Sequence, residues 1–245
     1  LTRQANAANI IIIDPTSPET AANNNGLVEF LTVHGRPTPS RAPADTVGPS
    51  EIAAYEGAFD LVIITSFSGQ FPTDVTADDR NAAWRALDVP ILIFDVQPTR
   101  ILHDERDLDM GGASDGTGTS AGKLTQLQIK NNTHYITEGY SVDEIITHHN
   151  PTPYTTIALK LGTTEATVLA EPQGSGSHDY DWGTIIVSDI GQQLFDGTVN
   201  TKRRCFMWPH FGGPGAGDAT YNDNFTADAK RLIQRAVNWL SLIHI

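Results

Sequence analysis

Three short apolar runs, each ending in a polar residue, dominate the hydrophobic pattern of the first part of the chain. They read IIIID at 10–14, FDLVIITS at 59–66 and VPILIFD at 89–95. Continuous Val, Ile, Leu and Phe runs of this length are typical of strands buried on both faces of a parallel sheet. In such sheets, ligands bind just past the carboxyl ends of the strands. The pattern therefore predicts a crevice at Asp14, Ser66 and Asp95.

Amphipathic segments lie between and after these runs. Capping residues and apolar spacing predict helices at 26–34, 50–55, 76–87 and 226–240. The segment at 36–50 is rich in proline, which leaves room only for a short edge strand near Thr46–Val47. Strands that alternate with helices in this way predict a parallel α/β sheet with right-handed crossovers.

The pattern changes after residue 122. A long glycine-rich, acidic loop is expected at 103–122, and loops of this length inside a compact domain are usually functional or disordered. Beyond it, turns instead of helices separate strand-like segments near 124–130, 142–147, 155–161, 166–170, 184–188 and 203–208. The C-terminal half is therefore expected to be richer in β-structure.

Length and charge limit the class of protein. A chain of 245 residues fits one domain, which we place at 1–240, and 241–245 resembles a non-native tail translated from sequencing-adapter sequence in a metagenome. The net charge of −13 argues against nucleic acid as a partner and against a polybasic membrane anchor. The chain does not begin with Met, so we expect a secreted or extracytoplasmic fragment, with a targeting segment removed, from a longer parent chain.

Six segments follow one another along residues 10–240: IIIID, FDLVIITSFSG, VPILIFD, HYITEG, ATVLAE and ADAKRLIQRAVNWL. Their order resembles that of the trehalose-utilisation (ThuA-like) family. HYITEG at 134–139 looks like the family's His-Pro-(x)-Thr-x-Gly turn, with Tyr135 in place of Pro. The resemblance implies a flavodoxin-like three-layer sandwich with a mostly parallel sheet, similar to class I glutamine amidotransferases, here with a β-rich decoration in the C-terminal half. It also implies a link to secreted bacterial proteins that handle carbohydrates.

The resemblance bears on catalysis as well. Amidotransferases carry a cysteine nucleophile at a sharp strand-to-helix turn, and here that kind of position holds Ser66, Phe67, Ser68 and Gly69. Because this turn has no cysteine, the amidotransferase reaction does not transfer. The one cysteine of the chain, Cys205, lies in a strand-like run and is expected to be a buried, inert thiol.

A first candidate site lies at the strand ends and is formed by Asp14, Ser66, Ser68, Asp95 and His210. A serine, a histidine and a carboxylate are the parts of a nucleophilic hydrolase. No Gly-x-Ser-x-Gly turn surrounds either serine, however, so polar residues that cap turns and helices are the favoured interpretation. The same cluster also suits a binding crevice without chemistry, in which Phe67, Gly69 and His103 would contact the ligand.

A second candidate site is the loop SGSHDYDWG at 175–183. Aromatic rings stack on the apolar faces of sugars, and carboxylates accept hydrogen bonds from sugar hydroxyls. The loop therefore suits sugar recognition through His178, Asp179, Asp181 and Trp182. An exposed loop whose tryptophan folds back onto the core explains the pattern equally well.

No metal site or cofactor is predicted. His148 and His149 are adjacent on a strand and point to opposite faces, so surface or turn histidines are favoured over a metal ligand aided by His134 or His103. The acidic residues Asp104, Glu105, Asp107 and Asp109 lack EF-hand spacing, which favours a solvated charge run over calcium ligands. The glycine-rich loop at 210–218 fits a mobile lid better than a phosphate cradle.

Three functional hypotheses follow from these features. The leading one is a secreted ThuA-like module that binds or modifies a carbohydrate, or another small molecule, at the carboxyl edge of its sheet. The second is a hydrolase, an esterase or a glycosidase, that uses Ser66 or Ser68 with His210, or paired carboxylates such as Asp14 and Asp95. The third is a structural module of a larger surface protein.

Overall fold

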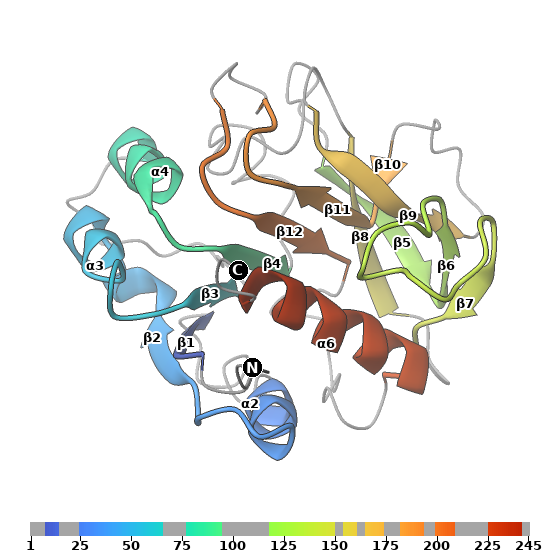
Figure 1. Ribbon diagram of the computed structural model, residues 1–245, viewed down its shortest axis with the longest axis horizontal. Coiled ribbons are helices and arrows are strands. Elements are labelled where there is room, and N and C mark those ends of the chain that lie inside the picture. Colours follow the sequence, from blue (N-terminus) through green and yellow to red (C-terminus); the bar gives the residue numbers. More distant parts are fainter. Residues whose placement is uncertain are drawn as a thin grey trace, which may run out of the picture.

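Two β-sheets organise the chain in the computed structural model (Figure 1). The structure describes residues 8–14, 25–65, 77–94, 118–149, 154–160, 165–173, 182–193, 199–208 and 225–241. Within these residues the large sheet has nine strands, in the order β2 (Ser40–Pro43), β1 (Ile10–Asp14), β3 (Leu61–Ile64), β4 (Ile91–Phe94), β12 (Arg204–Met207), β11 (Ile185–Ser188), β9 (Thr167–Gln173), β6 (Gln126–Ile129) and β7 (Ile145–Thr147).

A smaller sheet and the helices complete the described fold. The small sheet has three strands, in the order β10 (Trp182–Gly183), β8 (Tyr154–Lys160) and β5 (Gly118–Leu124). The helices are α2 (Asn25–Val33), α3 (Pro49–Ala53), α4 (Ala77–Ala86) and α6 (Ala227–Ser241). They confirm the helices predicted from the sequence to within one or two residues at nearly every end.

The large sheet is mixed, so the expectation of a mostly parallel sheet is wrong. Strands β2, β1, β3, β4 and β12 pair in parallel, whereas β12, β11, β9, β6 and β7 pair in antiparallel fashion. Parallel neighbours need a long crossover, which α2, α3 and α4 supply in the first half of the chain. The strands of the second half follow one another with no described helix between β5 and β12, and most of them pair in antiparallel fashion, as the predicted β-rich half suggests.

Helices cover both faces of the parallel strands because alternate residues point to opposite sides. Ile12 shares one core cluster with Leu31 of α2 and Ile233 of α6. Its neighbour Ile13 belongs to a second cluster, with Trp84 of α4. Figure 1 shows the same arrangement, with α3 and α4 on one side of β1, β3 and β4, and α2 and α6 on the other. Burial on both faces explains why these strands are continuous apolar runs.

The proline-rich segment forms an edge strand, but not where the sequence predicted it. The strand is β2, whereas Thr46 lies in a 3-10 turn at Ala44–Thr46. Strand β2 pairs with β1 alone and ends at Pro43. An edge strand needs hydrogen-bond donors on one side only, so it tolerates proline there.

The small sheet corrects the expected extent of the glycine-rich loop. Gly118 already pairs with Leu159, so β5 begins inside the segment expected to be a loop up to residue 122. Gly183 of β10 lies against the large sheet, where a Cβ atom would come within 2.5 Å of Ile186 Cγ1 and 3.1 Å of Val168 Cγ2. Glycine at this position therefore allows the small sheet to approach β9 and β11.

Candidate functional site

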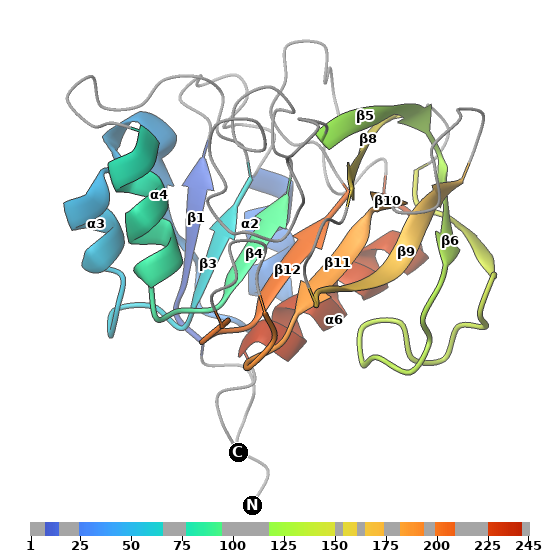
Figure 2. The ribbon, with the colours of Figure 1, turned by 90° about the horizontal axis from the view of Figure 1, so that it is seen from above.

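The carboxyl ends of the parallel strands form one edge of the large sheet, as predicted. Ile13 pairs with Ile64, Ile64 with Ile93, and Ile93 with Phe206. The residues that follow them therefore lie along the same edge, and they are Asp14, Thr65, Phe94 and Met207. Figure 2 shows β1, β3 and β4 running in the same direction towards this edge.

Asp14 forms an ion pair at this edge. Its carboxylate accepts a hydrogen bond from Nε of Arg41 on β2, and Arg41 Nη1 donates to Oδ1 of Asn25, 2.7 Å away, at the start of α2. Asp14 is only 5 % exposed, whereas the Arg41 side chain is about one third exposed. Three polar side chains from three elements thus meet at the edge, where Asn25 and Arg41 are exposed and Asp14 is buried.

Thr65 anchors the chain at the end of β3. It is fully buried, its N–H donates to the carbonyl of Ile13 at 3.1 Å, and its hydroxyl donates to the same oxygen at 2.8 Å. These bonds attach the end of β3 to β1. They hold the backbone directly before Ser66, the residue that the sequence analysis proposed as a nucleophile or ligand contact.

A second polar group lies beyond β12 and involves His148 and His149. The His148 ring lies 5.4 Å from the ring of Trp208, which directly follows β12, and the His149 ring lies 4.9 Å from that of Phe225. Both histidines are buried. Three strand spacings of about 4.8 Å separate β1 from β12, so Trp208 lies roughly 14 Å along the edge from Asp14.

The burial of these histidines overturns the expectation of surface or turn histidines. The start of α6 covers the end of β7, where the Thr226 N–H donates to His148 O at 3.3 Å and the Thr226 hydroxyl donates to Thr147 O at 2.7 Å. Burial, with the neighbouring His149 as a further cause, lowers the pKa of His148 to about 3. Burial lowers the pKa of His149 to about 4. Both rings are therefore neutral at physiological pH and suit hydrogen bonding to neutral groups.

The structure separates His134 from this group. The His134 ring lies 4.9 Å from that of Trp239, near the end of α6, whereas His148 lies at its start. The helix rises 1.5 Å per residue, so roughly 20 Å separates these two ends. A metal site that His148 and His134 share is excluded. In the described part of the chain, no three His, Cys, Asp or Glu residues are grouped so that they could hold a metal ion.

The HYITEG segment is a turn that docks on α6. His134 Nδ1 accepts the Ile136 N–H at 3.2 Å, and Arg235 of α6 donates to the carbonyl of Glu138. Gly139 closes the turn with a φ of 89°, a conformation that favours glycine. Burial lowers the pKa of His134, nearby Arg203 lowers it further, and Asp189 opposes them. The segment most characteristic of the resemblance therefore has a structural role.

Cys205 is fully buried within β12, as predicted. Burial raises the pKa of its thiol well above the usual range. A thiol that stays protonated is a poor nucleophile, so Cys205 has the properties of an inert core residue.

Trp182 and Gly183 are the part of the predicted sugar loop that the structure describes. The Trp182 backbone pairs with Lys160 in the small sheet, and Trp182 precedes Ile185, which is in register with Met207 at the end of β12. These two residues therefore lie close in sequence to the strand that borders the carboxyl end of β12. The remaining predicted site residues lie outside the described residues, and their roles stay predictions: Ser66, Phe67, Ser68, Gly69, Asp95, His103, His178, Asp179, Asp181 and His210.

Solved structures share this fold. A ThuA-like protein from Parabacteroides merdae superposes with a TM-score of 0.58 at 10% identity, over 96% of this chain and 90% of that chain. A ThuA-like protein from Bacteroides uniformis gives 0.52 at 8% identity, over 98% and 93%. The chain thus has the fold of ThuA-like proteins, which supports the resemblance found in the sequence.

A third similar structure is a carbohydrate deacetylase, Agd3. It gives a TM-score of 0.52 at 15% identity and covers 96% of this chain but only 32% of that chain. The match therefore concerns one part of a longer protein. No protein-family model matches the sequence, and no curated protein matches it either.

Proposed function

We propose that this domain is a ThuA-like module that binds or modifies a carbohydrate at the carboxyl edge of its large sheet. The observation that carries the proposal is the meeting of Asp14, Arg41 and Asn25 at that edge, in a fold shared with ThuA-like proteins. A carbohydrate deacetylase with a similar fold in part of its chain adds support. A partly exposed guanidinium beside a carboxylate and an amide is suited to the hydroxyl groups of a sugar.

The segment that ends at Trp182 supplies the rest of the proposed site. Ile185, three residues after Trp182, is in register with Met207 at the end of β12, and β12 lies three strands from β1, roughly 14 Å along the edge. Trp182 and the loop before it would form the rim, where a ring can stack on a sugar face. The sheet with helices on both faces is, in this proposal, an elaborated three-layer sandwich of the flavodoxin type.

Hydrolysis is the second candidate function, and the deacetylase neighbour is the observation that favours it. Ser66 or Ser68 would attack the acyl carbon of an ester, while His210 takes the hydroxyl proton and returns it to the leaving alcohol. Water would then release the acid and regenerate the serine. The buried bonds of Thr65 support this candidate, because they fix the end of β3 directly before Ser66.

Two expectations from the sequence belong to the same proposal. We propose that the domain works outside the cytoplasm, joined to other domains of a longer chain. No described helix is long and apolar enough to cross a membrane. Fractionation of the source cells, with detection of this domain, would test the proposed location directly.

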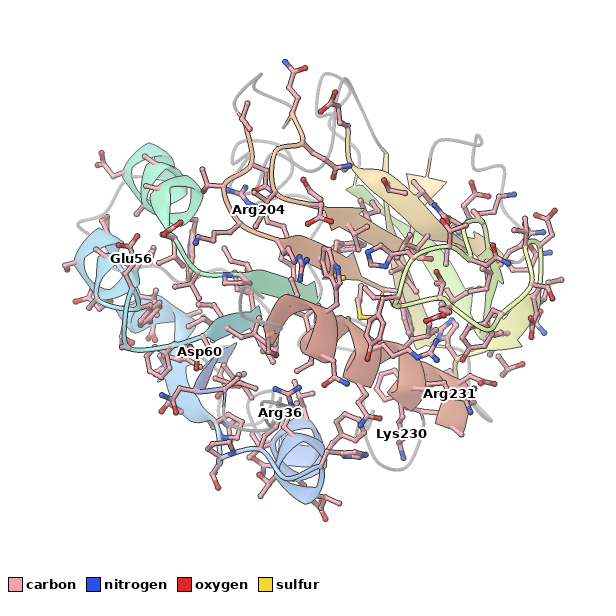
Figure 3. All side chains as sticks on the ribbon, in the orientation of Figure 1. Arg36, Glu56, Asp60, Arg204, Lys230 and Arg231 are labelled. Atoms are coloured by element: carbon pink, nitrogen blue, oxygen red, sulfur yellow. The ribbon has the colours of Figure 1, made fainter. Side chains whose placement is uncertain are left out.

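A glycan-array and ester-substrate screen tests the proposed function. The variants Asp14→Asn and Arg41→Gln should weaken glycan binding about tenfold or more, because each removes one charge from the edge. Asp60→Asn is the matched control, since Asp60 precedes β3 at the opposite edge of the sheet (Figure 3). Loss of ester cleavage in Ser66→Ala and His210→Ala would favour the hydrolase. Equal glycan binding in wild type and in both edge variants would refute the site.

A further inference from the structure

A groove separates α2 from the first half of α6, on the helical face of the sheet. It has a volume of about 640 Å³, within the range of roughly 300–1,000 Å³ that small-molecule sites occupy. Residues 29–34 of α2 form one wall and residues 227–234 of α6 form the other. Figure 3 shows Lys230 extending from α6 on the side where α2 lies.

The charges of the α6 wall are unusual for this chain. The chain has only 16 Lys and Arg against 29 Asp and Glu, yet Lys230 and Arg231 both line the groove near the start of α6. A helix N-terminus already has a partial positive charge, so cations there weaken the helix. Arg231 Nη1 lies 4.0 Å from Asp228 Oδ1 and Arg231 also interacts with Tyr140, while its side chain remains 58 % exposed. Glu29, on the opposite wall, is the acidic residue of the lining.

The α2 wall adds a polar nitrogen and apolar surface. The His34 ring lies on the Phe30 ring at 4.3 Å, and Nδ1 donates to the Phe30 carbonyl at 2.7 Å. These two contacts fix the ring and leave Nε2 on its other side, directed away from that bond. Val33 lines the same wall and is 74 % exposed, so its apolar side chain is accessible to a ligand in the groove.

We propose that this groove binds a small organic oxyanion, a molecule whose carboxylate or phosphate group is attached to a compact skeleton. The oxyanion lies against Lys230 and Arg231, where a guanidinium offers paired donors and the helix terminus adds its positive end. The skeleton lies against Val33, and Nε2 of His34 bonds one of its hydroxyls. The site shares no residue with the group of Asp14, Arg41 and Asn25 proposed as the carbohydrate site.

Calorimetric titration of the whole chain at low ionic strength tests this proposal. The probes are glucuronate, glucose 6-phosphate and neutral glucose. At least one of the two anions should bind saturably, and neutral glucose should not. The variant with Lys230→Gln and Arg231→Gln should lose about tenfold or more in affinity, because two charge-assisted contacts disappear. Tighter binding of either anion over the other identifies the oxyanion.

A charge-matched control distinguishes anion binding in the groove from a general effect of the net charge of the protein. The variant with Lys130→Gln and Lys202→Gln also removes two cations, but from ion pairs with Asp143 and Asp88 outside the groove. It should bind as wild type does. Val33→Asp should also weaken anion binding, because it introduces a repelling carboxylate at an exposed position of the groove without loss of a buried contact. Equal affinity in all variants, or no saturable anion binding, would overturn the proposal. Groove variants that keep wild-type glycan binding would show that the two sites are separate.

Discussion

Arg36 Nη1 donates a hydrogen bond to the hydroxyl oxygen of Ser241, 3.2 Å away, although 205 positions separate the two residues in the chain. Nη2 of the same guanidinium donates to Oδ1 of Asn238, so Arg36 joins the end of α2 to the end of α6. Arg36 is 6 % exposed, and burial lowers its pKa from the usual value. The helix continues through Ser241, one residue into the segment predicted to be a tail.

We predict that Arg36→Ala destabilises the protein by about 2–4 kcal/mol, because hydrogen bonds to a charged group and the packing of the side chain are lost together. Urea unfolding followed by circular dichroism measures this change. Arg231→Ala is the control, since Arg231 is exposed and its removal should change stability by less than about 0.5 kcal/mol. Equal effects of the two substitutions would contradict the assigned role of Arg36.

We predict that Asp14 and Arg41 are energetically coupled. A double-mutant cycle with Asp14→Ala and Arg41→Ala should give a coupling energy of about 1–3 kcal/mol, because the carboxylate is almost fully buried. The pair between Lys130 and Asp143 is the control, with side chains 33% and 62% exposed. Exposed pairs contribute roughly 0.2–1 kcal/mol. Similar coupling energies in both cycles would show that the burial of Asp14 does not strengthen its ion pair with Arg41.

We predict that acid destabilises this protein through His148. Its pKa is about 3 in the folded protein, whereas an exposed histidine has a pKa of about 6.5. Below that value the unfolded chain takes up a proton that the folded chain does not, so stability falls as the pH drops towards 3. Between pH 7 and pH 5 the loss from His148 is about 2 kcal/mol.

His148→Asn measures this contribution, because asparagine keeps polar atoms but does not titrate. Chemical unfolding of both proteins across the same pH range should show a shallower slope for the variant. Near-ultraviolet circular dichroism at neutral pH confirms that the variant is folded. Parallel slopes would show that His148 takes up its proton equally in the folded and unfolded states.

We predict that Gly183→Ala costs about 1–3 kcal/mol, because the added Cβ would overlap Ile186 Cγ1 at 2.5 Å. Combining it with Ile186→Ala should restore part of the loss, so that the double variant is more stable than the sum of the single effects. Thermal unfolding measures all three proteins. Gly57→Ala is a useful comparison, since nothing lies within 4 Å of its added Cβ and only its φ of 74° opposes the change. No partial rescue would show that the contact with Ile186 is not the cause.

The hydrophobic pattern of the sequence correctly predicted those elements in which all positions on a face are either buried or exposed. IIIID became β1, because both faces of this strand are covered by helices and each position must be apolar. The apolar stripe of α6 became its buried face because one side of this helix packs on the sheet, and Leu232 and Val237 are fully buried. The antiparallel pairing of β11 with β12 was not predictable in this way, because both strands are buried at every position, as the strands of a parallel sheet are.

The partners of the site residues were not predictable from local pattern. Asp14 was found because it ends an apolar run, but Arg41 was missed because β2 lies in a proline-rich segment with no apolar alternation. His148 was expected at the surface or in a turn because no ligand-spaced motif surrounds it in the sequence. Its covering residues, Trp208 and Thr226, come from segments far along the chain.

By itself, the sequence determined where strands end, which helix faces are buried, and hence which edge of the sheet gathers polar residues. These properties depend on the periodicity of side chains along a single element, and that periodicity is local. Only the tertiary structure decided that Arg41 meets Asp14, that His148 and His149 are buried and neutral, and that a cationic groove lies between α2 and α6. Such contacts join residues distant in the chain, so they arise only when the sheet and helices pack together.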